Sequence, residues 1–122
     1  MILADTSVWV AHLRGTETAL ARSLESGRVL MHPFVLGELA CGNLRNRREV
    51  LSLLASLPAS PVATDGEALQ YIERHSLMGR GIGWIDVHLL AATALAGTAR
   101  LWTTDARLRA VAVGLSLSFQ NT

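Results

Sequence analysis

The chain has 122 residues, of which 50% are hydrophobic, and this length predicts a single domain, residues 1–122, with its own hydrophobic core. The formal net charge of +1 excludes a broad basic surface, and the eleven cationic side chains are all arginines, which excludes lysine-dependent chemistry such as P-loop phosphate binding. The single cysteine, Cys41, excludes an internal disulfide. No apolar segment approaches the roughly 20 residues that span a bilayer. We therefore expect a cytoplasmic protein with no membrane partner.

Short apolar runs alternate along the chain with segments of helical spacing. Four runs predict parallel strands that are buried on both faces, at residues 2–4, 29–31, 61–63 and 101–103. The remaining segments predict helices at 7–14, 18–26, 34–43, 46–56, 65–78, 84–97 and 105–112. In the tail, Leu115, Leu117 and Phe119 alternate with small residues, which is typical of a half-exposed last strand. This order predicts an α/β fold, a three-layer α/β/α sandwich around a mainly parallel sheet.

The segment between the second and third predicted strands is longer than one crossover helix requires, and it predicts a helical pair. The apolar residues of this pair exceed what one sheet face consumes. They indicate either an apolar surface that a partner uses or simple completion of the core. These residues are Leu39, Leu44, Val50, Leu53, Leu54 and Leu57.

Two of the four aspartates follow predicted strands. Asp5 comes directly after the run at 2–4, and Asp105 follows the run at 101–103 with one residue between. The carboxyl ends of parallel strands form the edge at which open α/β sheets bind ligands. Each aspartate also precedes a predicted helix, where a helix N-cap explains it equally well, and the two roles are compatible.

Two further carboxylates lie in apolar helical segments. Asp86 is in the first turn of the helix predicted at 84–97, where the helix dipole contributes roughly 0.3–1 kcal/mol against a desolvation cost of several kcal/mol. Asp86 therefore requires a cation or a dense set of donors. Glu38 has apolar neighbours at i−4, i−3, i+1 and i+3, and it is either a fourth member of this group or a solvent-facing glutamate on an amphipathic helix.

Convergence of these four carboxylates requires a cation, because each pair at 4 Å repels by about 4 kcal/mol at an effective dielectric of 20. Hard divalent ions such as Mg²⁺ accept all-oxygen ligands and keep several waters, which leaves room for a substrate phosphate. A metal also lowers the pKa of a bound water and neutralises developing charge. Phosphodiester hydrolysis is the chemistry that such a site favours.

The motifs at residues 2–7 (ILADTS), 37–39 (GEL), 84–86 (WID) and 101–105 (LWTTD) resemble, in this order, those of PIN-domain nucleases. The closest resemblance is to the VapC-type toxins of bacterial type II toxin–antitoxin pairs, and it covers the whole chain. It implies a parallel sheet, an acidic Mg²⁺ or Mn²⁺ site, cleavage of RNA, a homodimer, and neutralisation by a VapB-like antitoxin.

The resemblance also implies roles for individual residues. Thr103 would hold Asp105 or a metal-bound water through its hydroxyl. Ser7 is a similar candidate, with capping of the next helix as the alternative. The implied metal ligands, which are also the catalytic residues, are Asp5, Glu38, Asp86 and Asp105.

Arginines near the motifs are candidates for RNA contacts. Arg80, within the glycine-rich segment 79–83, is placed to grip a phosphate, although a flexible loop with a solvated arginine explains it as well. Arg45, Arg47 and Arg48 either track substrate or solvate a helix end. Cys41 and the three tryptophans are predicted to be core residues, and the four histidines structural or surface residues.

Three other interpretations are compatible with the same sequence. The first is a non-toxin RNA-processing nuclease of the same fold. A ribonuclease H-like fold also gathers four acids, but it opens with an antiparallel hairpin, whereas helical sequence follows Asp5 here. The last is a non-enzymatic α/β module whose acids are helix caps and whose apolar helical pair binds a partner.

Overall fold

A parallel sheet forms the centre of the protein, seen in a computed structural model that describes residues 1–120. It contains three strands in the order β2-β1-β3, namely β1 (Ile2–Ala4), β2 (Val29–Leu30) and β3 (Arg100–Trp102). Leu3 is in register with Leu30 on one side and with Leu101 on the other. All three of these leucines are buried, as expected for a strand that is covered on both faces.

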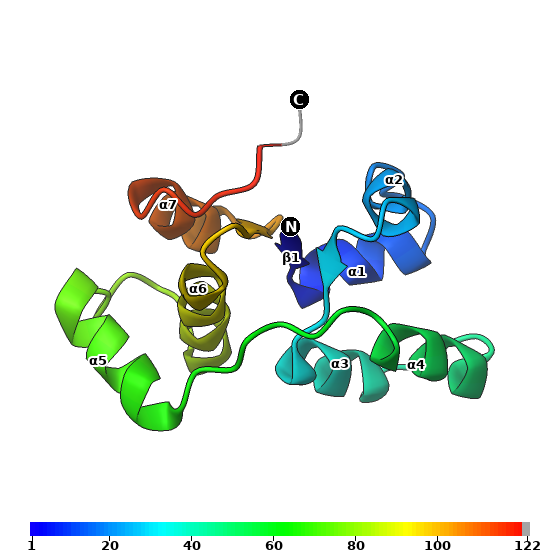
Figure 1. The fold of residues 1–122 in the computed structure, drawn as a ribbon, viewed down its shortest axis with the longest axis horizontal. Coiled ribbons are helices and arrows are strands. Elements are labelled where there is room, and N and C mark those ends of the chain that lie inside the picture. Colours follow the sequence, from blue (N-terminus) through cyan, green and yellow to red (C-terminus); the bar gives the residue numbers. More distant parts are fainter. Residues whose placement is uncertain (121–122) are drawn as a thin grey trace.

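Seven helices lie in the described part of the chain, and each corresponds to a predicted helix within a few residues. In Figure 1, α1 to α4 lie on one side of β1, and α5 to α7 lie on the other. The predicted three-layer α/β/α fold with a parallel sheet is thereby confirmed. The helices are α1 (Thr6–Leu13), α2 (Leu20–Glu25), α3 (Pro33–Ala40), α4 (Arg47–Ala55), α5 (Asp65–His75), α6 (Trp84–Ala96) and α7 (Ala106–Gly114).

The strand predicted at residues 61–63 does not form. Instead, Ala59 makes one isolated parallel bridge to Met31, in which the Met31 amide donates to the Pro58 carbonyl at 2.8 Å. Pro61 has no amide hydrogen to continue a ladder, so the chain leaves the sheet after this bridge. The sequence therefore predicted a contact at the edge of the sheet, but the contact lies at Ala59 rather than at 61–63, and it is a single bridge rather than a strand.

The predicted last strand is also reduced to a single contact. Ser118 forms an isolated parallel bridge to Leu101, whose amide donates to the Leu117 carbonyl at 2.6 Å. The amide of Phe119 donates to the Leu101 carbonyl at 2.8 Å. The tail thus lies along the outer edge of β3, and its alternating apolar residues are half-buried, as the pattern predicted.

Two residues predicted to be in the core are at the surface. Trp9 and Trp102 are buried, but Trp84, the first residue of α6, keeps 41% of its surface exposed. Cys41 is exposed because it caps the C-terminal end of α3, beyond the segment that packs on the sheet. An apolar sequence neighbourhood does not bury a residue that stands at a helix end.

The predicted helical pair is formed by α3 and α4. Leu39 and Leu54 enter the core, while Leu53 remains 61% exposed. Arg47 donates to the carbonyls of Ala40 and Gly42 at the end of α3, so this arginine caps the C-terminal end of that helix. The pair therefore both completes the core and leaves apolar surface outside it.

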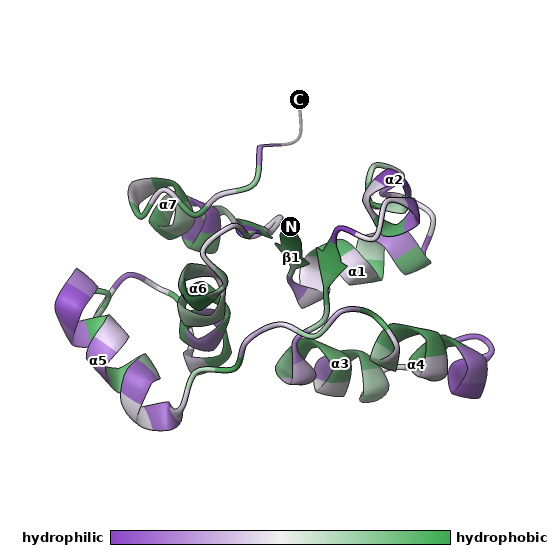
Figure 2. Ribbon diagram, viewed as in Figure 1, coloured by the Kyte–Doolittle hydropathy of each residue, from purple (hydrophilic) through white to green (hydrophobic). Residues whose placement is uncertain are grey.

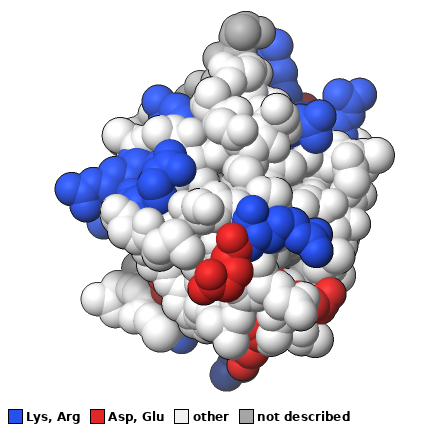
Figure 3. Space-filling model, turned by 90° about the vertical axis from the view of Figure 1, so that its left-hand side faces the viewer, with Lys and Arg blue, Asp and Glu red and all other residues white. Residues whose placement is uncertain are grey.

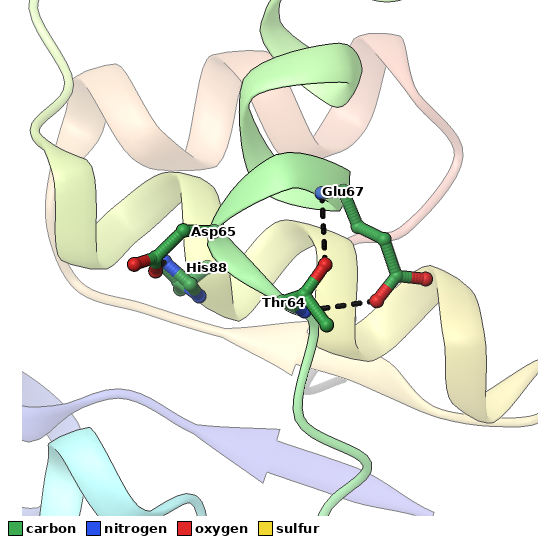
Figure 4. A network of polar contacts seen from close by, with 4 residues as sticks. All are labelled: Thr64, Asp65, Glu67 and His88. Atoms are coloured by element: carbon green, nitrogen blue, oxygen red, sulfur yellow. Dashed lines mark hydrogen bonds and ion pairs between the residues drawn. The ribbon is translucent and has the colours of Figure 1, made fainter.

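The difference in polarity between α5 and α6 follows from their positions. Residues 87–93 of α6 are buried, and the helix is largely hydrophobic in Figure 2, whereas α5 covers it from outside and is mainly hydrophilic. A capping box begins α5: Thr64 Oγ1 accepts from the Glu67 amide at 3.0 Å, and Glu67 Oε1 accepts from the Thr64 amide at 2.8 Å (Figure 4). Asp65 Oδ1 lies 3.3 Å from Nε2 of the buried His88.

None of the helices within residues 1–120 has the length and apolar character needed to cross a membrane.

His32 is a fully buried cap of α3. Its Nδ1 accepts from the Phe34 amide at 3.0 Å, and burial, with a smaller contribution from the charge of His88, lowers the pKa of His32 to about 4. The unfolded chain binds a proton at the ordinary pKa near 6.5, so the free energy of unfolding should fall by up to about 3 kcal/mol as the pH drops from 6.5 to 4.

Substitution His32→Asn retains a capping oxygen but removes the titrating group, and we expect it to flatten this part of the stability curve. Urea unfolding at pH 7 and pH 4.5 measures the difference. His75→Asn, which changes a histidine on α5, serves as the matched control. Equal losses of stability in the wild type and in His32→Asn would show that His32 is not the group responsible.

Candidate active site

Asp5 lies at the carboxyl end of β1, between the central sheet and α1. Its backbone amide donates to the Trp102 carbonyl at 3.0 Å, which holds it against the end of β3. Its side chain is 7% exposed, and Oδ1 accepts from the Val8 amide at 3.2 Å and from Ser7 Oγ at 2.5 Å. Asp5 is therefore the N-cap of α1, and the capping role is combined with a position at the ligand-binding edge of the sheet.

Thr103 connects the two aspartates that follow strands. Its buried hydroxyl donates to Asp5 Oδ2 and accepts from the Asp105 amide at 3.0 Å. The hydroxyl has one proton, and Asp5 receives it. The resemblance implied a bond to Asp105 or to a water, whereas the structure shows that Thr103 orients the carboxylate of Asp5 and only the backbone of Asp105.

Ser7 supports the same carboxylate from α1. Its hydroxyl donates to Asp5 Oδ1, as described above, and it accepts from the Thr104 amide at 3.2 Å. The helix cap in this position is Asp5, so capping by Ser7 is not observed. Ser7 instead ties the start of α1 to the loop that follows β3.

Asp105 begins α7. Its Oδ1 accepts from the Leu108 amide at 2.9 Å, which confirms the N-cap alternative, and the residue is exposed. Four residues further on, a guanidinium nitrogen of Arg109 donates to the Thr103 carbonyl at 3.1 Å. The i+4 spacing from Asp105 places Arg109 on the same side of α7, but no pattern in the sequence predicts its contact with Thr103.

Asp86 lies in the first turn of α6 and is half-buried. Its Oδ2 accepts from the Gly83 amide at 3.0 Å. Burial raises the pKa of Asp86, and the negative charges of Asp5 and Asp105 raise it further, while the Gly83 hydrogen bond opposes them. The charges of the two strand-end aspartates therefore act on Asp86 across the site.

Glu38 reaches the site from α3. Thr6 Oγ1, at the first position of α1, donates to Glu38 Oε1 at 2.7 Å. Thr6 directly follows Asp5 in the chain, so Glu38 is tied to the same helix start as Asp5. Thr6 is part of the ILADTS motif at residues 2–7, but its hydrogen bond to Glu38 could not be predicted from the sequence.

The fit of these side chains to a divalent cation rests on their free oxygens. Among residues 1–120, no protein donor reaches Glu38 Oε2, Asp86 Oδ1 or Asp105 Oδ2. These are hard oxygen donors of the type that Mg²⁺ and Mn²⁺ prefer. As the side chains stand, no three of the acidic, histidine or cysteine residues in the described chain are close enough together to hold an ion. The chemistry of the donors fits a divalent metal, but the predicted convergence of the four carboxylates around one ion is not present in the described residues.

Two arginines near residues 79–83 differ in their surroundings. Arg80, the candidate from the sequence, is exposed, and its side chain has no hydrogen bond or ion pair in the described structure. Arg107, from the first turn of α7, lies across the backbone of Gly81. Arg107 was not predicted as a functional residue, because no local pattern in the sequence connects it with the glycine-rich segment.

Known proteins resemble this chain over most of its length. The PIN domain family matches residues 2–114 of the chain. A protein named Ribonuclease VapC32, from two strains of Mycobacterium tuberculosis, is 48% identical over 110 residues, which cover 90% of this chain and 89% of that protein. The chain therefore belongs to the PIN-domain family and, within it, to the VapC-type ribonucleases.

Proposed function

We propose that the protein is a cytoplasmic, metal-dependent endoribonuclease that hydrolyses RNA phosphodiesters and acts as the toxin of a toxin–antitoxin pair. The family and the name of its relative support the ribonuclease activity. One structural observation carries the proposal: Asp5 and Asp105 follow the ends of the neighbouring parallel strands β1 and β3, and the Thr103 hydroxyl joins them. The negative charges of these two aspartates also raise the pKa of the half-buried Asp86. Mutual repulsion of this kind favours binding of a cation.

We propose that Mg²⁺ or Mn²⁺ is held by Asp5, Glu38, Asp86 and Asp105, directly or through water. With such an ion bound, the site would have a water of lowered pKa and a positive charge to offset the charge that develops on the phosphate. Hydrogen bonds from Ser7 and Thr103 fix the orientation of the Asp5 carboxylate and so limit the entropy lost when a ligand binds.

A cleavage assay on total bacterial RNA tests this function, with sequencing of the new RNA ends to detect narrow specificity. We expect discrete cuts in the presence of Mg²⁺ or Mn²⁺ and none after removal of divalent ions with a chelator. Cutting that survives the chelator would reject the metal dependence. Absence of cuts with either metal would reject the ribonuclease activity of the isolated protein.

A groove between α1 and the α3–α4 pair supports the proposal of a VapB-like antitoxin. The cavity has a volume of about 610 Å³ and is bordered by Glu38, so an occupant would lie beside the acidic site. Arg14 and Arg45 at its edge favour an amphipathic segment that carries acidic groups. The apolar residues that line it are Val10, Leu13, Leu39, Leu44 and Val50.

The substitution Leu13→Asp tests this groove. Leu13 is 39% exposed, so the change should leave folding and RNA cleavage intact. We expect the affinity for a VapB-like antitoxin to fall about tenfold or more, because a charge would be buried in the interface. Leu95→Asp, a similarly exposed leucine on α6, is the matched control. Equal affinities of the two variants would place the antitoxin elsewhere.

We also propose a homodimer, because the family resemblance implies one. The molar mass in solution, against 13.1 kDa for one chain, tests the proposal.

A further inference from the structure

Arg107 is held in an unusual position beside the candidate site. Its side chain lies so close to the Gly81 backbone that a Cβ atom at position 81 would be 2.7 Å from Arg107 Cδ and 3.1 Å from a guanidinium nitrogen. Gly81 also has φ +80°, a conformation that L side chains rarely adopt. The absence of a side chain at position 81 therefore creates the space that Arg107 occupies.

The two segments that meet at this contact both carry acids of the candidate site. Arg107 comes two residues after Asp105, the N-cap of α7. Gly81 comes two residues before Gly83, whose amide donates to Asp86. Arg107 thus lies at the junction of the loop that begins α6 and the turn that begins α7.

The guanidinium of Arg107 has no partner of its own among residues 1–120. No carboxylate lies within ion-pair distance of it, and it donates no hydrogen bond, whereas the nearby Arg109 binds the Thr103 carbonyl. Its aliphatic stem, in contrast, rests on the loop. An exposed cation with a supported stem loses less conformational entropy when it binds an anion than one that is free in solvent.

We propose that Arg107 binds a phosphate of the RNA strand next to the bond that is cleaved. This inference rests on the proposed ribonuclease function. An acidic site repels the RNA backbone, so a cation at its edge is needed to position the strand, and the planar guanidinium fork suits a phosphate. Figure 3 shows that the face carrying α5 and α7 has basic side chains in separate groups interspersed with acidic ones. This face has no continuous basic surface, so RNA phosphates would be bound there by single arginines.

The test measures binding of a fluorescently labelled single-stranded RNA to protein that carries Asp5→Asn, so that cleavage does not interfere. At low salt, Arg107→Gln should weaken binding about tenfold, and the slope of log K against log salt concentration should fall by about 0.7. Arg107→Lys should retain the slope because it keeps the charge. In the cleavage-competent protein, Arg107→Gln should raise KM more than it lowers kcat.

The matched control is Arg22→Gln, an exposed arginine on α2 far from α7 in Figure 1. An Arg107→Gln variant that melts earlier but keeps the affinity and the salt slope would show that Arg107 only packs the loop. Equal losses in Arg22→Gln would show a non-specific charge effect, and either result overturns the proposal. Failure of the ribonuclease function is distinguishable, because the protein would then cut no RNA whichever residue stands at 107.

Discussion

Asp5→Asn is expected to lower RNA cleavage by about 100-fold or more while the fold is retained. The amide keeps an oxygen that can accept from the Val8 amide and from Ser7, so the cap of α1 survives. The substitution removes the negative charge that we propose for metal binding, and charge stabilisation by a metal contributes several kcal/mol to the transition state. The rate of RNA cleavage at saturating Mn²⁺ measures the effect, and circular dichroism checks the fold.

Asp65→Asn is the control for this prediction. Asp65 is the one aspartate of the chain outside the proposed ligand set, and it lies at the start of α5 beside His88 (Figure 4). The same chemical change there should leave cleavage within a factor of about 2 of the wild type. Full activity in both variants would remove Asp5 from the site, and the proposal of a carboxylate metal centre at the end of β1 would be wrong.

Thermal unfolding gives the second large effect. We expect Mn²⁺ at about 100 times its dissociation constant to stabilise the wild-type protein by about 2.7 kcal/mol. For a chain of this length, that corresponds to a rise in Tm of roughly 10 °C. Asp86→Asn should abolish most of the rise, because it replaces one of the free carboxylate oxygens near Asp5 and Asp105 with an amide.

Without metal, the same substitution should have the opposite sign. Folding raises the pKa of Asp86, so the folded protein favours the protonated form, and stability is lost as the pH rises from the ordinary aspartate pKa through the raised one. A neutral amide avoids that loss, and metal-free Asp86→Asn should melt at or above the wild-type temperature at pH 7. A clearly lower Tm would mean that the hydrogen bond to Gly83 outweighs the burial and repulsion of the charge.

The contrast between α6 and the residues near 61–63 explains which elements the sequence could predict. The helical periodicity of α6 is local, and its buried residues 87–93 follow directly from a continuous apolar segment. A strand also needs a neighbour with free hydrogen-bonding groups, and Pro61 cannot continue the contact that Ala59 makes with Met31. The helices were therefore predicted within a few residues, whereas the sheet edges were not.

The sequence alone determined the alternation of strands and helices and the strand-end positions of Asp5 and Asp105, because both depend on hydropathy over a few adjacent residues. Only the tertiary structure decided that Thr103 gives its proton to Asp5, that Thr6 holds Glu38 and that Arg107 lies over Gly81. Each of these contacts joins segments far apart in the chain. Parallel pairing of β1 with β3 brings Thr103 to Asp5, and packing of α1 on α3 brings Thr6 to Glu38. The register of such pairing is not encoded in any one segment.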